Sequence, residues 1–364
     1  MTISYHSGRR IQGQSTDFAS KPAVSGGWKE LGRTTLGSAS DYLEVSGLAD
    51  KRYYKMIWHI IKGTSTWCQP GFRLGNSTVD TTAKYPERAS RDGATDATSA
   101  GNTYHGIWAN AASPNTDLFG VSYFTNLSAK EKLAIHHSTG SPAGAGSAPS
   151  RLESVGKWIN TSDPLDLVRL EHQATGNGYN TNSECVILGW DEDDTHTSNF
   201  WEELASVDLS GGAATSLSTG TFTAKKYLWV QIFSKKETSG GIQPSLKVGT
   251  GGTIATGSPY AFRWSNDGAT DPTPSVNLAM CPIAWLGANV HFSNTFIINN
   301  SGNEKLFINH SVANVTAGAG TAPQRVESVG KFANTSGQIN IIDLYDWDSA
   351  SLGTETIMKV WGSN

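Results

Sequence analysis

The chain has 364 residues, of which 16% are charged and 39 are glycine, and its formal net charge is −4. So few charges with so many glycines are typical of an all-β protein with many turns, and the length fits two domains of roughly 150 residues each. The balanced charge provides no basic face to neutralise phosphates, so we expect no nucleic-acid partner.

Two further classes of protein are disfavoured by what the sequence lacks. No apolar run reaches the roughly 18 residues of a membrane-spanning helix, and the first residues lack the apolar core of a signal peptide, so we expect no membrane contact and a cytosolic origin. Cys68, Cys185 and Cys281 are far apart and form no CxxC pair. We therefore predict buried, unpaired cysteine side chains rather than disulfides or a zinc site.

Residues 1–24 form a polar N-terminal arm with one basic pair, Arg9 and Arg10, and they have no counterpart later in the chain. A segment of this composition becomes ordered only when something holds it. We predict that a neighbouring subunit or another partner does so. The alternative is that the arm packs against its own domain.

The first strong strand pattern covers residues 53–58, and it recurs at residues 227–232. Every second residue is apolar in both copies, which predicts a half-buried strand. The predicted core positions are Tyr54, Met56 and Trp58 in the first copy and Leu228, Val230 and Ile232 in the second. The opposite face carries Lys55 and His59 in one copy and Trp229 and Phe233 in the other. Because these residues differ between copies, we expect their face to be free of core constraint.

The sequence DGATD occurs at residues 92–96 and again at 267–271. Asp-Gly is a strong signal for a tight turn or hairpin. A calcium loop is the alternative, but the motif offers too few carboxylates for a shell of six to eight oxygens. We therefore assign no metal ligands and expect no cofactor.

The loop that has changed most between the copies spans residues 99–116 in the first copy, and loops carry function more often than scaffolds do. Trp108 in this loop and Trp285 in the second copy occupy roughly equivalent places. Together with Trp67 and Trp229 they are our candidate residues for surface contacts.

The most informative stretch is GAGSAPSRLESVGKWINTS at residues 144–162, which recurs as GAGTAPQRVESVGKFANTS at residues 318–336. The two copies share 14 of 19 positions at an offset of 174 residues (318 − 144). A repeat of this length is domain-sized, well above the roughly 20–50 residues of solenoid repeats. The protein is therefore an internal tandem duplication.

Within this stretch, strand alternation places an Arg-Glu-Lys ladder on one face of each copy. The members are Arg151, Glu153 and Lys157 in the first copy and Arg325, Glu327 and Lys331 in the second. A solvent-facing ladder of opposite charges is the plain interpretation. The alternative is an ion-pair face between subunits. His137 and His310 recur on the preceding strand, where we interpret them as hydrogen-bonded histidines at the end of a core strand.

The acidic run that begins at Asp191 separates the two copies. We interpret it as a solvated linker, with cation binding as the alternative. The predicted organisation is an arm at 1–24, a β-sandwich at 25–190, a linker at 191–200 and a second sandwich at 201–364. Many short strands and no helical pattern predict an all-β fold of two tandem antiparallel β-sandwich, jelly-roll-like domains.

The sequence patterns bear on three classes of function. No GxSxG, HExxH, Walker or paired-carboxylate motif is present, so we do not expect an enzyme. A carbohydrate-binding module is a second class, because 12 Trp, 11 Tyr and 12 Phe could provide stacking platforms. A structural assembly protein is the third class.

The run from Arg88 through DGATD, the Ser/Asn-x-x-Glu-Lys-Leu segments at 128–133 and 301–306, and the GAGxAPxRxESVGK…NTS block carry a resemblance that favours this third class. In these motifs the chain resembles poorly characterised marine bacteriophage virion proteins built from single or duplicated β-rich units. The resemblance covers most of both copies, about residues 28–190 and 201–361. The resemblance implies a virion location after synthesis in the host cytoplasm.

This resemblance implies capsid decoration or a tail or fibre component as the role of the chain. Homo-oligomers and other virion proteins are the expected partners, with a host surface glycan as the alternative. A double-jelly-roll major capsid protein is a second alternative. No catalytic or binding residue is carried over, because no chemistry is attached to these motifs.

Overall fold

The computed structural model describes most of the chain from Gly27 to Asn364. The described residues are 27–65, 68–107, 117–174, 176–191, 199–237, 242–269, 271, 275–284, 289–314, 318–347 and 351–364. Three of the candidate contact residues, Trp67, Trp108 and Trp285, lie outside them, as do the N-terminal arm and most of the acidic linker.

Residues 29–190 form two antiparallel sheets. The larger sheet has eight strands, in the order β1 (Lys29–Thr35), β13 (Glu184–Trp190), β3 (Tyr53–Ile61), β9 (Asp117–Thr125), β10 (Lys132–Ser141), β11 (Ser150–Trp158), β6 (Glu87–Arg91) and β7 (Ala97–Ser99). The smaller sheet has five, in the order β2 (Tyr42–Val45), β12 (Leu167–His172), β4 (Pro70–Asn76) and β5 (Thr78–Val79), with β8 (His105–Gly106) paired to β4.

Residues 202–363 repeat this arrangement strand for strand. The second large sheet runs β14 (Glu202–Asp208), β26 (Ile357–Ser363), β16 (Tyr227–Lys235), β22 (Val290–Ile298), β23 (Lys305–Asn314), β24 (Gln324–Phe332), β19 (Tyr260–Asn266) and β20 (Ser275–Leu278). The second small sheet runs β15 (Ser216–Ser218), β25 (Ile339–Asp346), β17 (Pro244–Thr250) and β18 (Thr253–Ile254), with β21 (Cys281–Pro282) on β17. We call the two arrangements the first and second units.

The all-β prediction is confirmed, since the described residues form strands and no helix. Hence no described helix is long enough to cross a membrane. Each unit encloses its own apolar core between its large and small sheets. The predicted core positions of β3 and β16 are 1% exposed or less, and the three cysteines are buried and unpaired as expected.

Several repeated polar residues have structural roles inside each unit. The Tyr85 hydroxyl accepts from the Leu74 amide, and the Tyr260 hydroxyl accepts in the same way from the Val248 amide. The buried Lys132 ammonium donates to the carbonyl oxygen of Asn160, which belongs to the first NTS sequence. Lys305 and Asn334 repeat that bond in the second unit. In both units the lysine of the EKL motif thus hydrogen-bonds the asparagine of the NTS motif and connects a strand end to a loop.

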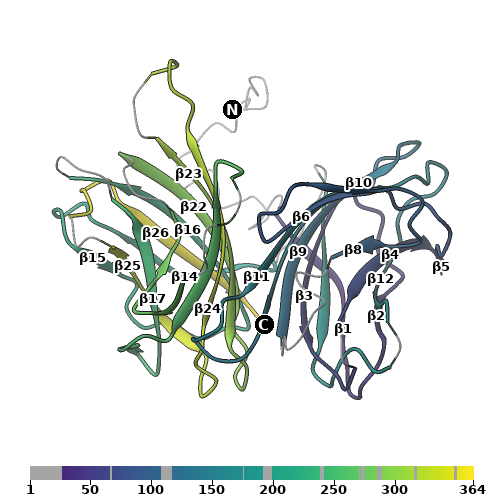
Figure 1. The fold of residues 1–364 in the computed structure, drawn as a ribbon, viewed down its shortest axis with the longest axis horizontal. Helices are drawn as coiled ribbons and strands as arrows, with labels where there is room; N and C mark the ends of the chain where they lie inside the picture. Colours follow the sequence, from purple (N-terminus) through teal and green to yellow (C-terminus); the bar gives the residue numbers. More distant parts are fainter. Residues whose placement is uncertain are drawn as a thin grey trace, which may run out of the picture.

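The two units lie side by side with their large sheets turned toward each other (Figure 1). Strands β10 and β23 are in contact across the boundary. A third apolar cluster fills the space between these outer faces. Its buried members are Ile57, Phe119, Val121, Val186 and Leu188 from the first unit and Phe200, Tyr227, Phe296, Ile298, Leu306, Ile308 and Val329 from the second unit and the residues before it.

This boundary corrects one expectation from the sequence. The face of β3 that carries Lys55 and His59 was expected to be free of core constraint, yet these side chains are 2% and 0% exposed. The second unit covers them. Strand alternation identifies residues that share a face, but it gives no information about what packs on that face.

We expect Gly120→Ser to destabilise the chain by about 1–3 kcal/mol, because overpacking a filled core forces neighbours to move. A Cβ at Gly120 would meet the Trp58 ring at 2.3 Å. The second unit has Ser293 and Ile232 at the matching positions of β22 and β16. Trp58→Ile combined with Gly120→Ser should therefore be less destabilising than the sum of the two single changes.

Urea unfolding of the full chain measures these free energies. Gly37→Ser is the control, because nothing lies within 4 Å of a Cβ built at Gly37. Strict additivity of the two core substitutions would contradict the proposed coupling.

Candidate functional site

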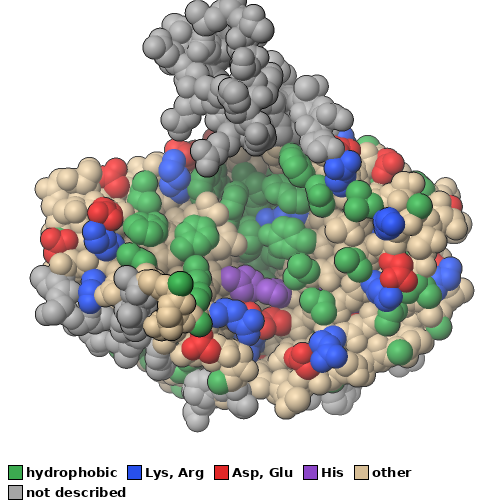
Figure 2. Space-filling view, turned by 90° about the horizontal axis from the view of Figure 1, so that it is seen from above, with side chains coloured by type: hydrophobic (Ala, Val, Ile, Leu, Met, Phe, Trp, Pro, Cys, Tyr) green, Lys and Arg blue, Asp and Glu red, His purple; other side chains and the backbone are tan. Residues whose placement is uncertain are grey.

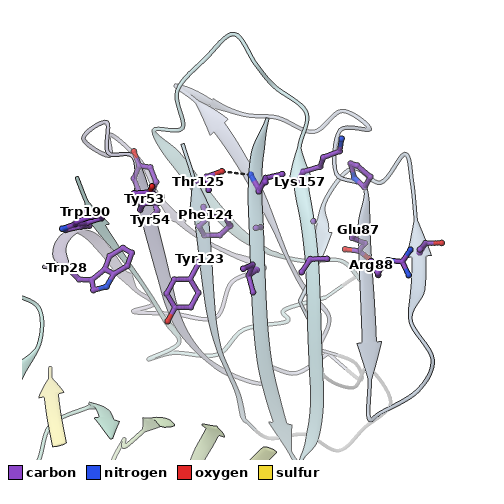
Figure 3. Close-up of a pocket in the computed structure, with 17 residues that line it drawn as sticks. Trp28, Tyr53, Tyr54, Glu87, Arg88, Tyr123, Phe124, Thr125, Lys157 and Trp190 are labelled. Atoms are coloured by element: carbon purple, nitrogen blue, oxygen red, sulfur yellow. Dashed lines mark hydrogen bonds between the residues drawn. The ribbon is translucent and has the colours of Figure 1, made fainter. Parts of the chain in front are cut away.

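An apolar groove crosses the outer face of the first large sheet (Figure 3). It has a volume of about 770 Å³. Its floor is aliphatic, with Leu133, Ile135 and Val155 exposed by 54%, 54% and 47%. Aromatic residues line one end, where Tyr53 and Trp190 stack with their ring centroids 5.4 Å apart. Adjacent β-strands bring these side chains together because residues two apart on a strand point to the same face.

The other end of the groove carries charge, but each charged side chain has a partner. The Lys157 ammonium lies 2.6 Å from the Glu131 carboxylate, and the Arg88 guanidinium lies 3.6 Å from Asp96. The Glu87 carboxylate accepts a hydrogen bond from the Gly106 amide at 2.7 Å. The described surface of the groove therefore suits an apolar occupant better than a polar one.

The same sheet face is covered in the second unit. Leu306, Ile308 and Val329 occupy the places of Leu133, Ile135 and Val155, and they are 0%, 2% and 2% exposed. The first unit covers them through its Phe119 and Val121 region. The two units therefore pack asymmetrically, and among the described residues this apolar face is open in the first unit and covered in the second. Figure 2 shows a hollow lined by apolar side chains, with histidines and charged residues beside it.

Next to the groove, Lys55 crosses the boundary into an aromatic cage. Its ammonium lies 3.8 Å from the ring centroid of Phe296 and between 5.2 and 5.6 Å from those of Tyr123, Trp201 and Trp229. Among the described residues no carboxylate forms an ion pair with it, so the ring faces supply the compensating electrostatic attraction. Burial lowers the pKa of Lys55 well below its ordinary value of 10.5.

Trp229, a candidate surface-contact residue, belongs to this cage. Its ring lies 4.7 Å from that of Trp361 and stacks at 5.9 Å on Phe296. Its indole nitrogen donates to the Asn294 side-chain oxygen at 2.5 Å. These contacts half-bury the side chain and give it a packing role at the boundary.

The Arg-Glu-Lys ladders lie beside the boundary, and their two copies have different surroundings. Arg151 is 3% exposed, and its guanidinium donates to the Asp271 carboxylate of the second unit at 2.5 Å. It also contacts Glu153 and lies 3.8 Å from Glu327. Arg325, the matching residue, is 59% exposed and pairs with Glu327 at 3.4 Å. The solvent-facing prediction is therefore wrong for Arg151, because the second unit covers it.

The lysines of the ladders differ in the same way. Lys157 is partly exposed, whereas Lys331 is fully buried and lies 3.5 Å from Glu304. The Gly/Ala/Pro loop of the first unit covers the second pair, since the Pro142 carbonyl accepts from Lys331 and the Gly144 amide donates to Glu304. The ladder face therefore forms ion pairs between two units of one chain. Pairing with a second subunit stays a prediction.

Asp92-Gly93 and Asp267-Gly268, which begin the two DGATD sequences, form tight turns next to these arginines. Asp92 and Asp267 both adopt positive φ and both accept a side-chain hydrogen bond, from the backbone amides of Arg151 and Arg325 respectively. Asp92 also pairs with Arg263 of the second unit at 3.3 Å. Within the described residues, no group of three or more His, Cys, Asp or Glu side chains has the arrangement of a metal site.

Four titratable side chains meet near the centre of this boundary. The rings of His137 and His310 lie 4.0 Å apart, and burial lowers their pKa values to about 4 and about 3. Burial, followed by the nearby Glu153 carboxylate, raises the pKa of Glu327 to about 7. A polar hollow of about 500 Å³ lies beside the two glutamates. The two repeats share these residues, but no sequence pattern predicts that they meet, because matching residues in a repeat need not be neighbours.

Comparisons with known proteins identify no family for this chain. No protein-family model matches it, and no curated protein matches it. Among solved structures, the LG1–3 region of the laminin alpha2 chain shows 9% sequence identity over 88% of this chain and 68% of that one. Its TM-score of 0.21 is too low to support an argument about fold or function.

We expect Arg151→Ala to lower the free energy of unfolding by about 3–5 kcal/mol, because it leaves the buried Asp271 carboxylate without its closest cation. The matched substitution Arg325→Ala should cost about 0–1 kcal/mol, because Arg325 is a surface ion-pair partner. Chemical denaturation of the full chain tests both. Equal costs for the two substitutions would show that the asymmetric boundary is wrong.

We also expect the boundary to give a bell-shaped dependence of stability on pH. The folded chain keeps a proton at Glu327 that the unfolded chain releases near pH 4.5, so the contribution of Glu327 to stability should fall as pH rises from about 4.5 to about 7. The lowered pKa values of His137 and His310 give a contribution of opposite slope, which falls as pH drops from about 6.5 toward 3–4. The two contributions oppose each other between about pH 4.5 and 6.5, so total stability should fall below that window through the histidines and above it through Glu327.

Glu327→Gln should remove the first slope, which amounts to about 1–3 kcal/mol. The free energy of unfolding measured by urea titration between pH 4 and pH 8 checks this. An unchanged slope in the variant would assign the effect to another group.

Proposed function

We propose that this protein is a non-enzymatic structural component of a phage particle, located on the virion surface as capsid decoration or as part of a tail or fibre. The virion assignment rests on the resemblance of the repeated motifs. The open apolar groove of the first unit is the observation that carries the binding role. In this proposal another virion protein packs onto the groove.

The physical argument begins with the exposed aliphatic floor of the groove. Leu133, Ile135 and Val155 lie together on adjacent strands, and each is about half exposed. Contiguous exposed apolar patches on soluble proteins mark interaction sites, because covering them gains about 25 cal/mol per Å². The third apolar core ties both units together, so a partner that docks here meets a preorganised surface and loses little entropy in ordering it.

A glycan-binding module is the second candidate. The stacked rings of Tyr53 and Trp190 at one end of the groove are the observation that favours it. Against it, the floor between the aromatic end and the charged end is aliphatic, and a sugar ring needs hydrogen-bond partners as well as a stacking surface. The aliphatic floor of the groove therefore suits a docked protein better than a glycan.

We expect Ile135→Glu to reduce binding of the chain to phage particles at least tenfold, because it places an unpaired charge in an apolar contact. The assay is co-sedimentation of the purified full chain with particles from which this protein has been removed. Ile135 is half exposed, so the substitution should leave the fold unchanged, which unfolding curves would confirm.

Leu127→Glu is the matched control, because Leu127 is 40% exposed in the same unit but does not line the groove. Loss of binding in both variants, or in neither, would refute a docking role for the groove. Retained particle binding together with glycan-array binding that depends on Tyr53 would support the second candidate.

A further inference from the structure

We propose that the apolar groove of the first unit binds a free fatty acid, whose carboxylate pairs with Lys55 and whose alkyl chain lies on the aliphatic floor. This ligand goes beyond the proposed function and is independent of the virion assignment. Three observations support it: a row of side chains across the groove, the missing counter-ion of Lys55, and the residue at the matching place in the second unit.

A single row of side chains crosses the groove perpendicular to its strands. The strand register pairs Lys55 with Tyr123 and Tyr123 with Ile135. Ile135 pairs in turn with Val155. Directly paired residues lie on the same face of a sheet, so all four side chains share the outer face. Tyr123 stands between the aromatic end of the groove and its floor (Figure 3). A ligand that lies along the row therefore has its head at Lys55 and its tail over Val155.

The length of this row suits a medium-length alkyl chain. Three strand spacings separate Lys55 from Val155, about 14 Å at 4.8 Å each. An extended chain of single bonds advances about 1.2 Å per bond, as the protein backbone does, so the twelve carbons of dodecanoate span about 13 Å. The groove volume of about 770 Å³ also lies within the range of small-molecule sites, roughly 300–1,000 Å³.

Among the described cations of the groove and the cage, Lys55 alone has no carboxylate partner. The two cations at the far end of the groove, Lys157 and Arg88, already have one each. The Lys55 ammonium instead faces rings, with the centroids of Phe296 and Tyr123 at 3.8 and 5.2 Å. A counter-ion gains more in such a water-poor environment than at the surface. The flexible four-carbon stem of lysine allows the ammonium to turn toward a carboxylate that arrives beside Tyr123.

The second unit shows that the fold does not need a lysine at this place. Trp229 is the matching residue, and its row continues through Phe296, Ile308 and Val329. That row is aromatic and aliphatic throughout. A buried charge without a partner costs free energy that an apolar residue avoids. Lys55 is therefore a poor choice for packing alone, which favours a role in binding an anion.

The charges and the floor of the groove together favour a carboxylate over other anionic ligands. One cation without a counter-ion matches a ligand with one negative charge. A phosphate monoester carries about −1.5 to −2, so part of its charge would stay uncompensated beside apolar rings. The aliphatic side chains beyond Tyr123 match an alkyl chain, because covering them removes apolar surface from water. A fatty acid combines both features in one molecule.

Isothermal titration calorimetry of the full chain with dodecanoate, below its micelle concentration, tests this assignment. Lys55→Met should weaken dodecanoate binding at least tenfold, because it removes one partner of a buried ion pair. Dodecanol has the same chain without the charge, and its affinity should change less than twofold. Lys130→Met is the matched control, because Lys130 is exposed in the same unit and does not line the groove.

Equal dodecanoate affinity of the wild-type chain and Lys55→Met would overturn the assignment, as would a wild-type chain that binds no dodecanoate. An equal loss of dodecanol binding in Lys55→Met would also overturn it, because shape rather than charge would then decide the affinity. Urea unfolding curves check that the variant is folded, which we expect because it loses a buried charge and gains an apolar side chain.

A second pair of variants locates the ligand. Ile135→Glu should weaken the binding of both dodecanoate and dodecanol at least tenfold, because it places a charge in the middle of the row. Leu127→Glu should affect neither. Unchanged dodecanoate binding by Ile135→Glu would place the ligand elsewhere and refute the proposal. Calorimetry involves no phage particles, so failure of this inference and failure of the proposed function can be told apart.

Discussion

Burial of the outer faces of the two large sheets against each other is the constraint on which the rest of this structure depends. A sandwich domain on its own has a solvated outer face, but here Ile57, Phe119 and Val186 make that face apolar in the first unit. Neither unit can leave such a face in water without a large free-energy cost. The two sandwiches therefore act as one block with three apolar cores.

The contact between the units is not symmetric, although the units repeat each other strand for strand. Arg151 is buried against Asp271, while Arg325 remains largely exposed. Lys331 is sealed under the loop of the first unit, while Lys157 stays at the surface. Once a duplicated chain packs in this way, equivalent residues experience different dielectric surroundings. The same residue type then contributes to stability where it is buried and to solubility where it is exposed.

The asymmetry also creates the candidate site. Full coverage of one sheet face by the other unit leaves the matching face in the first unit open, and that face retains aliphatic residues. Lys55 connects the two regions, because its cage includes Tyr123 from the groove and Phe296 from the buried boundary. The groove therefore adjoins a tightly packed boundary, which favours a rigid docking surface.

The sequence by itself determined the repeat, the all-β class, the buried cysteines and the core faces of β3 and β16. These follow from local rules, because alternation and turn residues act over a few neighbours along the chain. Only the tertiary structure decided that the opposite face, with Lys55, is buried, that Arg151 pairs with Asp271, and that Leu133 is open while Leu306 is covered. Those outcomes depend on how two units meet, and a period of two along a strand identifies a face without specifying what covers it.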